Sequence, residues 1–294
     1  METFWSTNVQ GVKTLFLSRS LRFKDGFFKD FENIFNIDKD KKVKILELGC
    51  GPGALIHRLS EVYPNASLYG LDRDRNFIDF ANEFVVSGKF FLDDLEDLYF
   101  KENDFDIVIS YTLAEHIDPD CLLSIQEKLL KKGGKMIIMS VLHSSNDILN
   151  YVKLDKNLED EEEKVWERLR DVHFPDLKEE GVRKFNLSEA ELFKKIREFS
   201  FKDISINNVF TRICPDDDEV SEELANLIFD TKKISQEEIL ERLYRDDYIT
   251  DDEAELLFDN LDKRLEIRKE EYENKEKIFD REIVLTSVIC ATRK

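Results

Sequence analysis

The stretch Val43-Lys44-Ile45-Leu46-Glu47-Leu48-Gly49-Cys50-Gly51-Pro52-Gly53 decides the fold that we expect for this chain. Its first half is a short apolar run, which predicts a strand buried on both faces. The three alternate glycines let the backbone turn sharply and approach a ligand closely, which a Cβ would obstruct. Apolar residues follow at helical spacing over 54–61, so the first N–H groups of that helix would point at the turn. A strand, a glycine turn and a helix in this order are typical of a site for a nucleotide-like ligand.

One acid in this stretch separates two kinds of nucleotide site. A Rossmann dinucleotide site begins with a similar glycine turn. Glu47, at the carboxyl end of the predicted strand, would repel the pyrophosphate of a dinucleotide but would attract the ammonium and sulfonium groups of S-adenosylmethionine. The charge therefore favours a cationic ligand, and an oxidoreductase that uses a nicotinamide cofactor is the least favoured enzyme class.

Further carboxylates follow two more predicted strands. The second strand is expected at 66–71 and ends in Asp72, about 20 residues after the glycine turn, where a carboxylate binds ribose hydroxyls. The third strand is expected at 89–92 and ends in Asp93 and Asp94. A carboxylate there can accept a hydrogen bond from an adenine amino group. A nicotinamide cofactor does not require this third acid.

Taken in order, these motifs resemble those of the class I S-adenosylmethionine-dependent methyltransferases. The resemblance rests on ExGxGxG at 47–53, Gly-Leu-Asp-Arg-Asp at 70–74, Leu-Asp-Asp-Leu at 92–95, and the stretches 105–110, 115–117 and 129–135. It covers roughly the first half of the chain and resumes near the carboxyl terminus. It implies an enzyme that transfers a methyl group from S-adenosyl-L-methionine and leaves S-adenosyl-L-homocysteine as product.

The resemblance also implies the fold. We expect an α/β, Rossmann-like seven-stranded sheet with the order 3-2-1-4-5-7-6, an antiparallel last strand and helical insertions. The remaining elements of the core are predicted to be strands at 105–111 and 135–141, a helix at 119–131 that Gly133-Gly134 ends, and strands at 201–210 and 283–292. About 70 residues separate the last two strands, where the family has a short turn.

In that family the glycine turn binds the methionine part of the cofactor, the acid after the second strand binds ribose, and the acid after the third binds adenine. Asp94 is favoured over Asp93 for adenine, with the backbone N–H of Leu95 beside it. Cys50 is interpreted as a small buried residue of the turn rather than a nucleophile. The residues predicted to bind the cofactor are Glu47, Gly49, Cys50, Gly51, Gly53, Asp72, Arg73, Asp93, Asp94, Leu95, Ser110, Arg19 and Arg22.

Arg19 and Arg22 are included because of their spacing. They are three residues apart on one side of a predicted helix, in a segment (8–35) whose apolar pattern predicts one or two amphipathic helices before the first strand. Either guanidinium would suit the cofactor carboxylate or an anionic substrate. The alternative is that both are surface cations.

Residues after the fourth and fifth strands are expected to face the transferred methyl group, because ligands bind at the carboxyl ends of parallel strands. His116 is the first candidate for a general base, since imidazole titrates near neutral pH, and a structural role is its alternative. Tyr111 and His143 are weaker candidates. Methyl transfer is an in-line displacement, and alignment of the reacting atoms within about 3 to 3.5 Å provides much of the acceleration. A dedicated base is therefore not required.

The composition fits a cytoplasmic protein. The formal net charge of −20 disfavours a nucleic-acid substrate, because phosphate binding needs basic patches. No stretch approaches the roughly 20 apolar residues of a membrane helix, and the amino terminus lacks the pattern of a signal peptide. The four cysteines lie far apart without a CxxC pair, which indicates neither a metal site nor a disulfide framework. We expect no metal and no membrane partner.

The chain is predicted to divide into five parts. They are a helical cap (1–42), the cofactor-binding Rossmann-like core (43–145), a helical lid insertion (146–186), the remainder of the core with a helix and strands six and seven (187–212 and 281–294), and an acidic helical insertion (213–280). In the lid insertion, a helical pattern is expected over 146–170 with an acidic break at 159–163. Trp166, His173 and Phe174 would line either a substrate pocket or an edge of the core.

The acidic insertion holds 24 acidic and 10 basic residues. Capping boxes at Ser235 to Glu238 and Thr250 to Glu253 predict a helical hairpin, after an earlier helix over 221–232. A third capping box, from Ser188 to Glu191, predicts a helix of the core. The insertion would cap the active site, pair two subunits as a homodimer or bind a partner protein, and the sequence does not choose.

The leading hypothesis is a methyltransferase that acts on a small-molecule acceptor by in-line displacement. Methylation of a protein or peptide held against the insertions is a second hypothesis. A third is a non-catalytic regulatory or interaction protein that binds S-adenosylmethionine.

Overall fold

The computed structural model describes residues 3–95, 100–172, 177–179, 181–185 and 187–294. The helices are α1 (Phe4–Asn8), α2 (Val12–Arg22), α3 (Asp25–Phe35), α4 (Ala54–Val62), α5 (Arg75–Phe84), α6 (Pro119–Leu129), α7 (Lys156–Arg170), α8 (Glu189–Glu198), α9 (Glu222–Arg245) and α10 (Asp251–Glu273). The strands are β1 (Lys44–Leu48), β2 (Ser67–Asp72), β3 (Gly88–Leu92), β4 (Phe105–Tyr111), β5 (Leu130–Asn146), β6 (Phe201–Ile213) and β7 (Glu282–Arg293).

The chain forms two compact units. The first, here called the core unit, comprises residues 1–143, 176–211 and 284–294, and the second, here called the helical unit, comprises 144–175 and 212–283. The helical unit holds α7, α9 and α10, and the chain enters and leaves it through the long strands β5, β6 and β7. The finer division into five parts, predicted from the sequence, stays a prediction.

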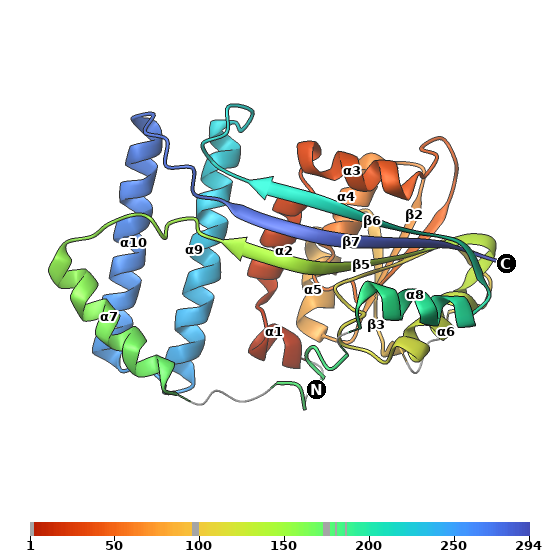
Figure 1. The fold of residues 1–294 in the computed structure, drawn as a ribbon, viewed down its shortest axis with the longest axis horizontal. Helices are drawn as coiled ribbons and strands as arrows, with labels where there is room; N and C mark the ends of the chain where they lie inside the picture. The colour runs from red at the N-terminus through yellow and green to blue at the C-terminus, as the bar shows by residue number, and fades with distance from the viewer. Residues whose placement is uncertain (1–2, 96–99, 173–176, 180, 186) are drawn as a thin grey trace. The chain divides into compact units, whose positions relative to one another are not determined.

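A seven-stranded sheet organises the core unit. Its strand order is β3-β2-β1-β4-β5-β7-β6, which confirms the predicted order. β1 is parallel to both β2 and β4, and its residue Glu47 lies opposite Gly70 on one side and Ile109 on the other. β7 runs against β5 and β6, its neighbours in the sheet (Figure 1). The carboxyl ends of β1, β2, β3 and β4 therefore meet at one edge of the sheet.

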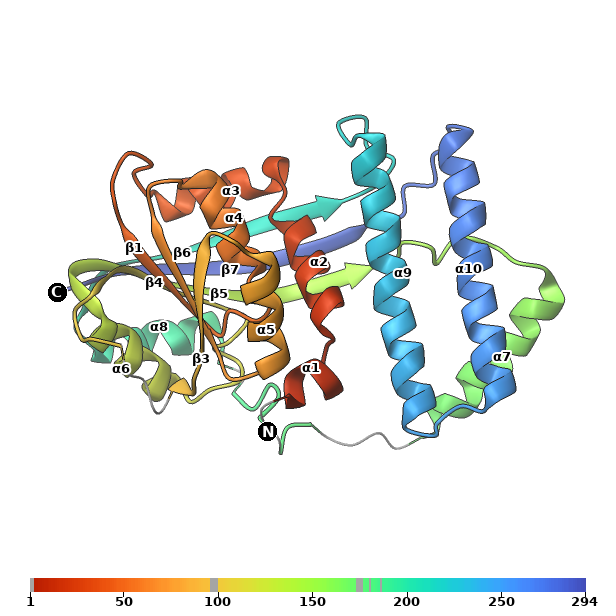
Figure 2. The ribbon, with the colours of Figure 1, turned by 180° about the vertical axis from the view of Figure 1, so that it is seen from behind.

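Helices cover both faces of this sheet. Alternate residues of each buried strand point to opposite faces, so Ile45 and Leu46 of β1 belong to different clusters of buried side chains. One cluster joins the sheet to α3, α4 and α5, and the other joins it to α6 and α8. Figure 2 shows α2 to α5 on the face opposite α6 and α8. Burial on both faces explains why the central strands are almost continuously apolar.

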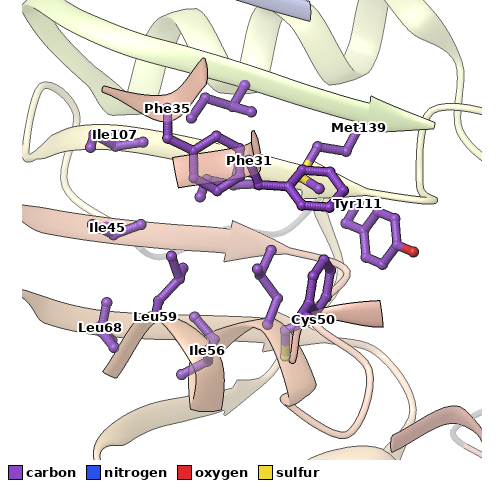
Figure 3. Close-up of a cluster of buried hydrophobic side chains, with 14 of the residues drawn as sticks. Phe31, Phe35, Ile45, Cys50, Ile56, Leu59, Leu68, Ile107, Tyr111 and Met139 are labelled. Atoms are coloured by element: carbon purple, nitrogen blue, oxygen red, sulfur yellow. The ribbon is translucent and has the colours of Figure 1, made fainter. Parts of the chain in front are cut away.

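Phenylalanines of α3 make up much of the first cluster. Phe31 and Phe35 lie one turn apart on the buried side of the helix and meet Ile45, Ile107 and Met139 from three strands (Figure 3). Burial of such side chains contributes about 1.5 to 3 kcal/mol each. This packing fixes α3 against the sheet.

The helical unit is held together by a buried ion cluster. Arg268 of α10 is fully buried, and its guanidinium donates hydrogen bonds to Asp280 and, at 2.6 Å, to Asp216. Asp280 also accepts from the backbone N–H of Leu149, and Asp216 accepts from two backbone N–H groups at 278–279. The cluster thus ties together both of the chain segments that form this unit.

Three predictions about the insertions and the core helix were wrong in detail. Ser235 does not start a helix: α9 begins after the cap residue Ser221 and runs unbroken through 235, because apolar residues continue at helical spacing across it. The acidic run 159–163 does not break a helix either, since it lies inside α7. Gly133 and Gly134 lie within β5, at an irregularity in its pairing with β4, and the preceding helix ends at Leu129. The capping boxes at Ser188 and Thr250 are confirmed.

Candidate active site

The glycine turn after β1 has the backbone geometry that its sequence predicts. Gly49, Gly51 and Gly53 all have positive φ angles, of 67°, 54° and 86°. Residues other than glycine rarely adopt positive φ angles. The turn is tied to β2, because the backbone N–H of Cys50 donates to the carbonyl of Leu71 at 2.9 Å. Gly53 is the cap residue of α4, so the amino terminus of this helix faces the turn.

Asp72 connects this turn to the end of β2. Its Oδ2 accepts a hydrogen bond from the backbone N–H of Gly51 at 2.8 Å, and its Oδ1 accepts one from the backbone N–H of Asp74 at 2.9 Å. Burial raises the pKa of Asp72, and the two backbone donors oppose that effect. An ionised carboxylate offers about four acceptor positions, so further positions remain for hydroxyl donors.

Glu47 lies in β1, two residues before Gly49, and is completely buried. Neither oxygen of its carboxylate has a hydrogen-bond partner among the described residues. Burial raises its pKa to about 8, although the nearby cation of Arg19 acts in the opposite direction. An unpartnered buried carboxylate is costly unless a donor or a cation completes its environment. This environment fits the cationic ligand that the sequence predicts.

Arg19 and Arg22 of α2 both reach the end of β4. A guanidinium nitrogen of Arg19 donates to the hydroxyl of Thr112, and its Cζ lies 5.0 Å from the centre of the Tyr111 ring. Arg22 lies 3.4 Å from the Tyr111 hydroxyl. A Cβ on Gly51 would lie 3.2 Å from Arg19 Nη1, so this arginine also covers the glycine turn. The two predicted arginines are therefore beside the site and not on a remote surface.

The amino-terminal helix α1 is anchored beside the same edge. Asp74, fully buried, caps α5 by accepting from the backbone N–H groups of Asn76 and Phe77. The same carboxylate accepts from the hydroxyl and the backbone N–H of Ser6, at 2.8 and 2.9 Å. Asp74 thus fixes α1, and with it Trp5, near the end of β2.

The other residues predicted to bind the cofactor lie at the same edge. Ser110, the last residue but one of β4, lies opposite Leu48 and is completely buried, with a hydroxyl that has no partner among the described residues. Asp93 accepts from the backbone N–H of Asp94, and the Asp94 side chain is exposed. Leu95 packs against the cluster of buried side chains beneath it. Which of the two acids meets adenine stays a prediction.

Cys50 points away from this edge into the buried cluster, and it is 1% exposed. Burial raises the pKa of its thiol well above the usual value. A neutral, enclosed thiol is a poor nucleophile. The structure agrees with its interpretation as a buried residue of the turn.

His116 is held in one orientation by two neighbours. Its Nδ1 accepts a hydrogen bond from the backbone N–H of Arg183 at 2.8 Å, and its ring makes an edge contact with Trp5 at a centroid distance of 4.6 Å. Burial and the Arg183 cation lower its pKa to about 4. Because Nδ1 is an acceptor, the neutral ring carries its proton on Nε2 and has no free lone pair. This arrangement favours a structural or hydrogen-bonding role over that of a base.

The two weaker candidates for a base are placed differently. Tyr111 is 1% exposed and packs against Phe23, at a centroid distance of 5.3 Å. His143 is exposed near the end of β5 and is not joined to the residues described above. Trp166 lies in α7 of the helical unit and donates to Glu162. His173 and Phe174 lie outside the described residues.

Three residues of this edge were not predicted from the sequence: Trp5, Asp74 and Arg183. For Asp74 the sequence does contain a signal, since an Asp directly before a helical pattern is a common helix cap. Trp5 and Arg183 carried no local signal, because only the fold brings 3–8 and 181–185 to the end of β4. Within the described residues there is no group of three or more His, Cys, Asp or Glu side chains that would hold a metal ion.

The strand order, the glycine turn and the two strand-end acids define a class I S-adenosylmethionine-dependent methyltransferase. The model of a family described as a methyltransferase domain matches residues 39–272. The chain therefore belongs to this family, whose cofactor is S-adenosylmethionine.

Curated relatives match part of the chain. The ubiquinone biosynthesis O-methyltransferase of Pelagibacter ubique is 30% identical over 123 residues, which are 40% of this chain and 50% of that protein. The malonyl-[acyl-carrier protein] O-methyltransferase of Hahella chejuensis is 29% identical over 101 residues, 33% of this chain and 36% of that protein. The chain thus spans about half or less of the length of these relatives.

A solved structure shows the same fold. Phosphoethanolamine N-methyltransferase 2 of Haemonchus contortus, in complex with phosphomonomethylethanolamine and S-adenosylhomocysteine, superposes with a TM-score of 0.50 at 16% identity. The superposition covers 98% of this chain and 59% of that one. At this identity the likeness concerns the fold alone.

Proposed function

We propose that this protein transfers a methyl group from S-adenosylmethionine to a small-molecule acceptor at the carboxyl ends of β1 to β4. The observation that carries the proposal is the hydrogen bond from the Gly51 N–H to Asp72, in the turn that follows the unpartnered buried carboxylate of Glu47 on β1. The buried acid Glu47 suits the cationic part of a ligand, and the strand-end acid Asp72 suits the ribose of a nucleoside. With the glycine turn between them, the site fits a cationic nucleoside.

Different residues of this edge bind different parts of the cofactor. Glu47 and the turn residues Gly49, Gly51 and Gly53 hold the methionine part, Asp72 accepts from ribose hydroxyls, and Asp94 with the N–H of Leu95 holds adenine. Arg19 lies over Gly51 and is the cation nearest to the place of the cofactor carboxylate. Ser110 and the backbone at Cys50 close the bottom of the site.

When bound, the cofactor supplies an electrophilic methyl group on a sulfonium, which passes to the acceptor and leaves S-adenosylhomocysteine. The protein contributes mainly by positioning the acceptor in line with that methyl group. His116, which stays neutral and is held by the backbone at 181–183, helps to position the acceptor rather than removing a proton from it. A dedicated base is not part of the proposal.

The small-molecule acceptor is supported by the relatives and by charge. The Pelagibacter relative is named for ubiquinone biosynthesis, whose product is a small molecule. The net charge of −20 disfavours nucleic acid. Among the described residues, no helix is long and apolar enough to cross a membrane. We place the activity in the cytoplasm as part of the same proposal.

The second candidate is methylation of a protein or peptide. It is favoured by the helical unit, in which α9 and α10 (222–273) form a long antiparallel pair that the core fold does not need. The same unit would serve a homodimer or a partner protein. A purely regulatory protein that binds the cofactor is the third candidate, and it differs from the other two by releasing no methyl group.

Calorimetric titration with S-adenosylmethionine and, separately, with NADH tests the cofactor. The proposal expects saturable binding of S-adenosylmethionine and none of NADH. Asp72→Asn keeps the size and one acceptor oxygen of the side chain but removes its charge, and Asp79→Asn, at an exposed position of α5, is the matched control. Binding of NADH alone, or equal affinities in both variants, would contradict the assignment.

A further inference from the structure

Three arginines surround His116 at the end of β4. Arg183 donates its backbone N–H to the ring, Arg73 lies over the Trp5 ring at 5.9 Å from its centre, and Trp5 contacts His116. Arg19 bonds the hydroxyl of Thr112, the residue that follows β4. The cations of all three arginines act on the imidazole and lower its pKa. A local excess of positive charge thus lies in a chain whose net charge is −20.

Arg19 differs from the other two because carboxylates of the cofactor site face it. Its cation lowers the pKa of Glu47, Asp72 and Glu115, each of which burial raises. Its charge is therefore shared among acids on the cofactor side. Arg19 thus serves the cofactor side of the site and contributes little attraction for an anion of the acceptor.

Arg73 and Arg183 act on fewer carboxylates than Arg19 does. Among the described residues, neither guanidinium forms an ion pair with a carboxylate. Arg58, Arg168 and Arg264, in other parts of the chain, each form one. Glu115 is the acid that Arg183 influences, and Arg19 already acts on it. Both side chains are exposed, so they are accessible to a ligand.

The contacts around Trp5 make this place a built site. Asp74 fixes Ser6, and so holds the neighbouring Trp5 ring against His116 and beneath Arg73. The His116 ring is fixed in turn by the backbone of Arg183. Trp5 and His116 form an aromatic wall whose two rings meet edge to face at 77°, with the Arg73 guanidinium over the Trp5 ring and the backbone of Arg183 beside His116. A guanidinium in such a place suits a planar or compact anion.

We propose that Arg73 and Arg183 bind a carboxylate or phosphate group of the methyl acceptor, against the wall formed by Trp5 and His116. This inference rests on the proposed function and names its substrate class: a small anionic molecule, or one carried on an anionic group. These two arginines bind the charged group of the acceptor, while the cofactor carboxylate is left to Arg19. Arg73, which the sequence predicted to bind the cofactor, is thereby proposed for the acceptor instead. In the opposite assignment, Arg73 and Arg183 hold the cofactor carboxylate. The test below distinguishes the two assignments.

Fluorescence of Trp5 reports on this site. The chain has two tryptophans, so Trp166→Phe in the full chain leaves Trp5 alone. The protein is first saturated with S-adenosylhomocysteine, with binding verified by calorimetry. Inorganic phosphate and benzoate are then titrated at constant ionic strength, with benzamide as the uncharged match of benzoate. We expect a saturable change with both anions and at least tenfold weaker binding of benzamide.

Variants assign the effect to the two arginines. The double change Arg73→Ala and Arg183→Ala should weaken phosphate binding at least tenfold, and the corresponding double change to lysine should restore part of it, since lysine keeps the charge. Arg197→Ala, at an exposed position of α8, is the control and should change nothing. Affinity for S-adenosylhomocysteine should stay the same in all variants.

Three results would overturn the inference. They are the absence of a saturable anion effect on Trp5, equal binding by the wild type and the double alanine variant, and a parallel loss of S-adenosylhomocysteine affinity, which would assign the two arginines to the cofactor. Failure of the proposed function has a different signature, because it appears as absent cofactor binding before any anion is added.

Discussion

The backbone N–H of Gly51 donates a 2.8 Å hydrogen bond to the carboxylate of Asp72, so the glycine turn after β1 and the end of β2 form one structural unit. The bond orients the acid toward the turn while leaving acceptor positions for a ligand. Two motifs that lie about 20 residues apart in the sequence are in direct contact. The candidate site is therefore preformed in the fold.

Replacing Asp72 by Asn should weaken S-adenosylmethionine binding. Loss of charge-assisted hydrogen bonds to ribose costs about 1.5 to 3 kcal/mol, which is roughly a 10- to 150-fold rise in the dissociation constant. Calorimetry measures it, with Asp79→Asn as control. A dissociation constant within twofold of the wild type would remove Asp72 from the site.

Gly51→Ala should impair both the turn and the ligand site. The residue has a φ of 54°, and a Cβ there would lie 3.2 Å from Arg19 Nη1. A left-handed conformation costs a residue other than glycine about 1 to 2 kcal/mol. Gly26→Ala in α3 is the matched control, because its Cβ would meet nothing within 4 Å. Thermal unfolding should show a lower Tm for the first variant alone, and a reversed order would contradict the account.

Glu47 should make the unliganded protein less stable as the pH rises. Its pKa is raised from 4.5 to about 8 by burial, so across this window the folded chain keeps a proton that the unfolded chain has lost. The free energy of unfolding therefore falls as pH rises from about 4.5 to about 8 and levels off above. Urea unfolding of the wild type and of Glu47→Gln measures the difference, and parallel pH profiles would contradict the pKa.

The same carboxyl should couple cofactor binding to proton release. A cationic ligand favours the ionised form of Glu47, so binding at pH 7 should release protons and affinity should rise toward pH 8. Calorimetry in two buffers of different ionisation enthalpy counts the protons. Glu47→Gln should bind more weakly and release fewer, and identical proton counts would show that Glu47 does not ionise on binding.

His116 should remain neutral through the physiological pH range. Its pKa is lowered from 6.5 to about 4, first by burial and then by Arg183. Its ring signals in NMR spectra, assigned by their loss in His116→Gln, should not titrate between pH 5 and 8. Because the unfolded chain takes up this proton first, the contribution of His116 to stability falls as the pH drops from 6.5 toward 4. A titration midpoint near 6.5 would restore the general-base hypothesis.

Arg268→Ala should destabilise the helical unit by about 3 to 5 kcal/mol, since it leaves Asp216 and Asp280 buried without a cation. Trp166, which belongs to the same unit, reports its unfolding in urea. Lys277→Ala is the control, because it breaks an ion pair with the exposed Asp218. Equal shifts of the Trp166 transition in the two variants would show that the buried cluster is not what stabilises this unit.

The sequence was sufficient for those parts of the fold that depend on local patterns. Apolar runs located the strands, and the Ser188 and Thr250 boxes located two helix starts, because each signal lies within four residues. Ser235 carried the same local pattern and failed, since its helix had already begun at 222. A capping box marks a start only where the chain is not yet helical.

The candidate site was predictable where it consists of strand ends and not where it consists of side chains from distant segments. Glu47 and Asp72 follow directly from the order of strands and turns. The contact of Trp5 with His116, and of His116 with the backbone at Arg183, joins positions 67 to 111 residues apart. No local pattern encodes such a contact, since it depends on how α1 and the segment 181–185 pack at the end of β4.

The central claim is tested most directly by incubating the protein with methyl-labelled S-adenosylmethionine in a cell extract and separating small molecules from protein. The account predicts label in an anionic small-molecule fraction, and a strong loss of that label with Asp72→Asn. Label in the protein fraction, or none transferred by a protein that binds the cofactor, would contradict it.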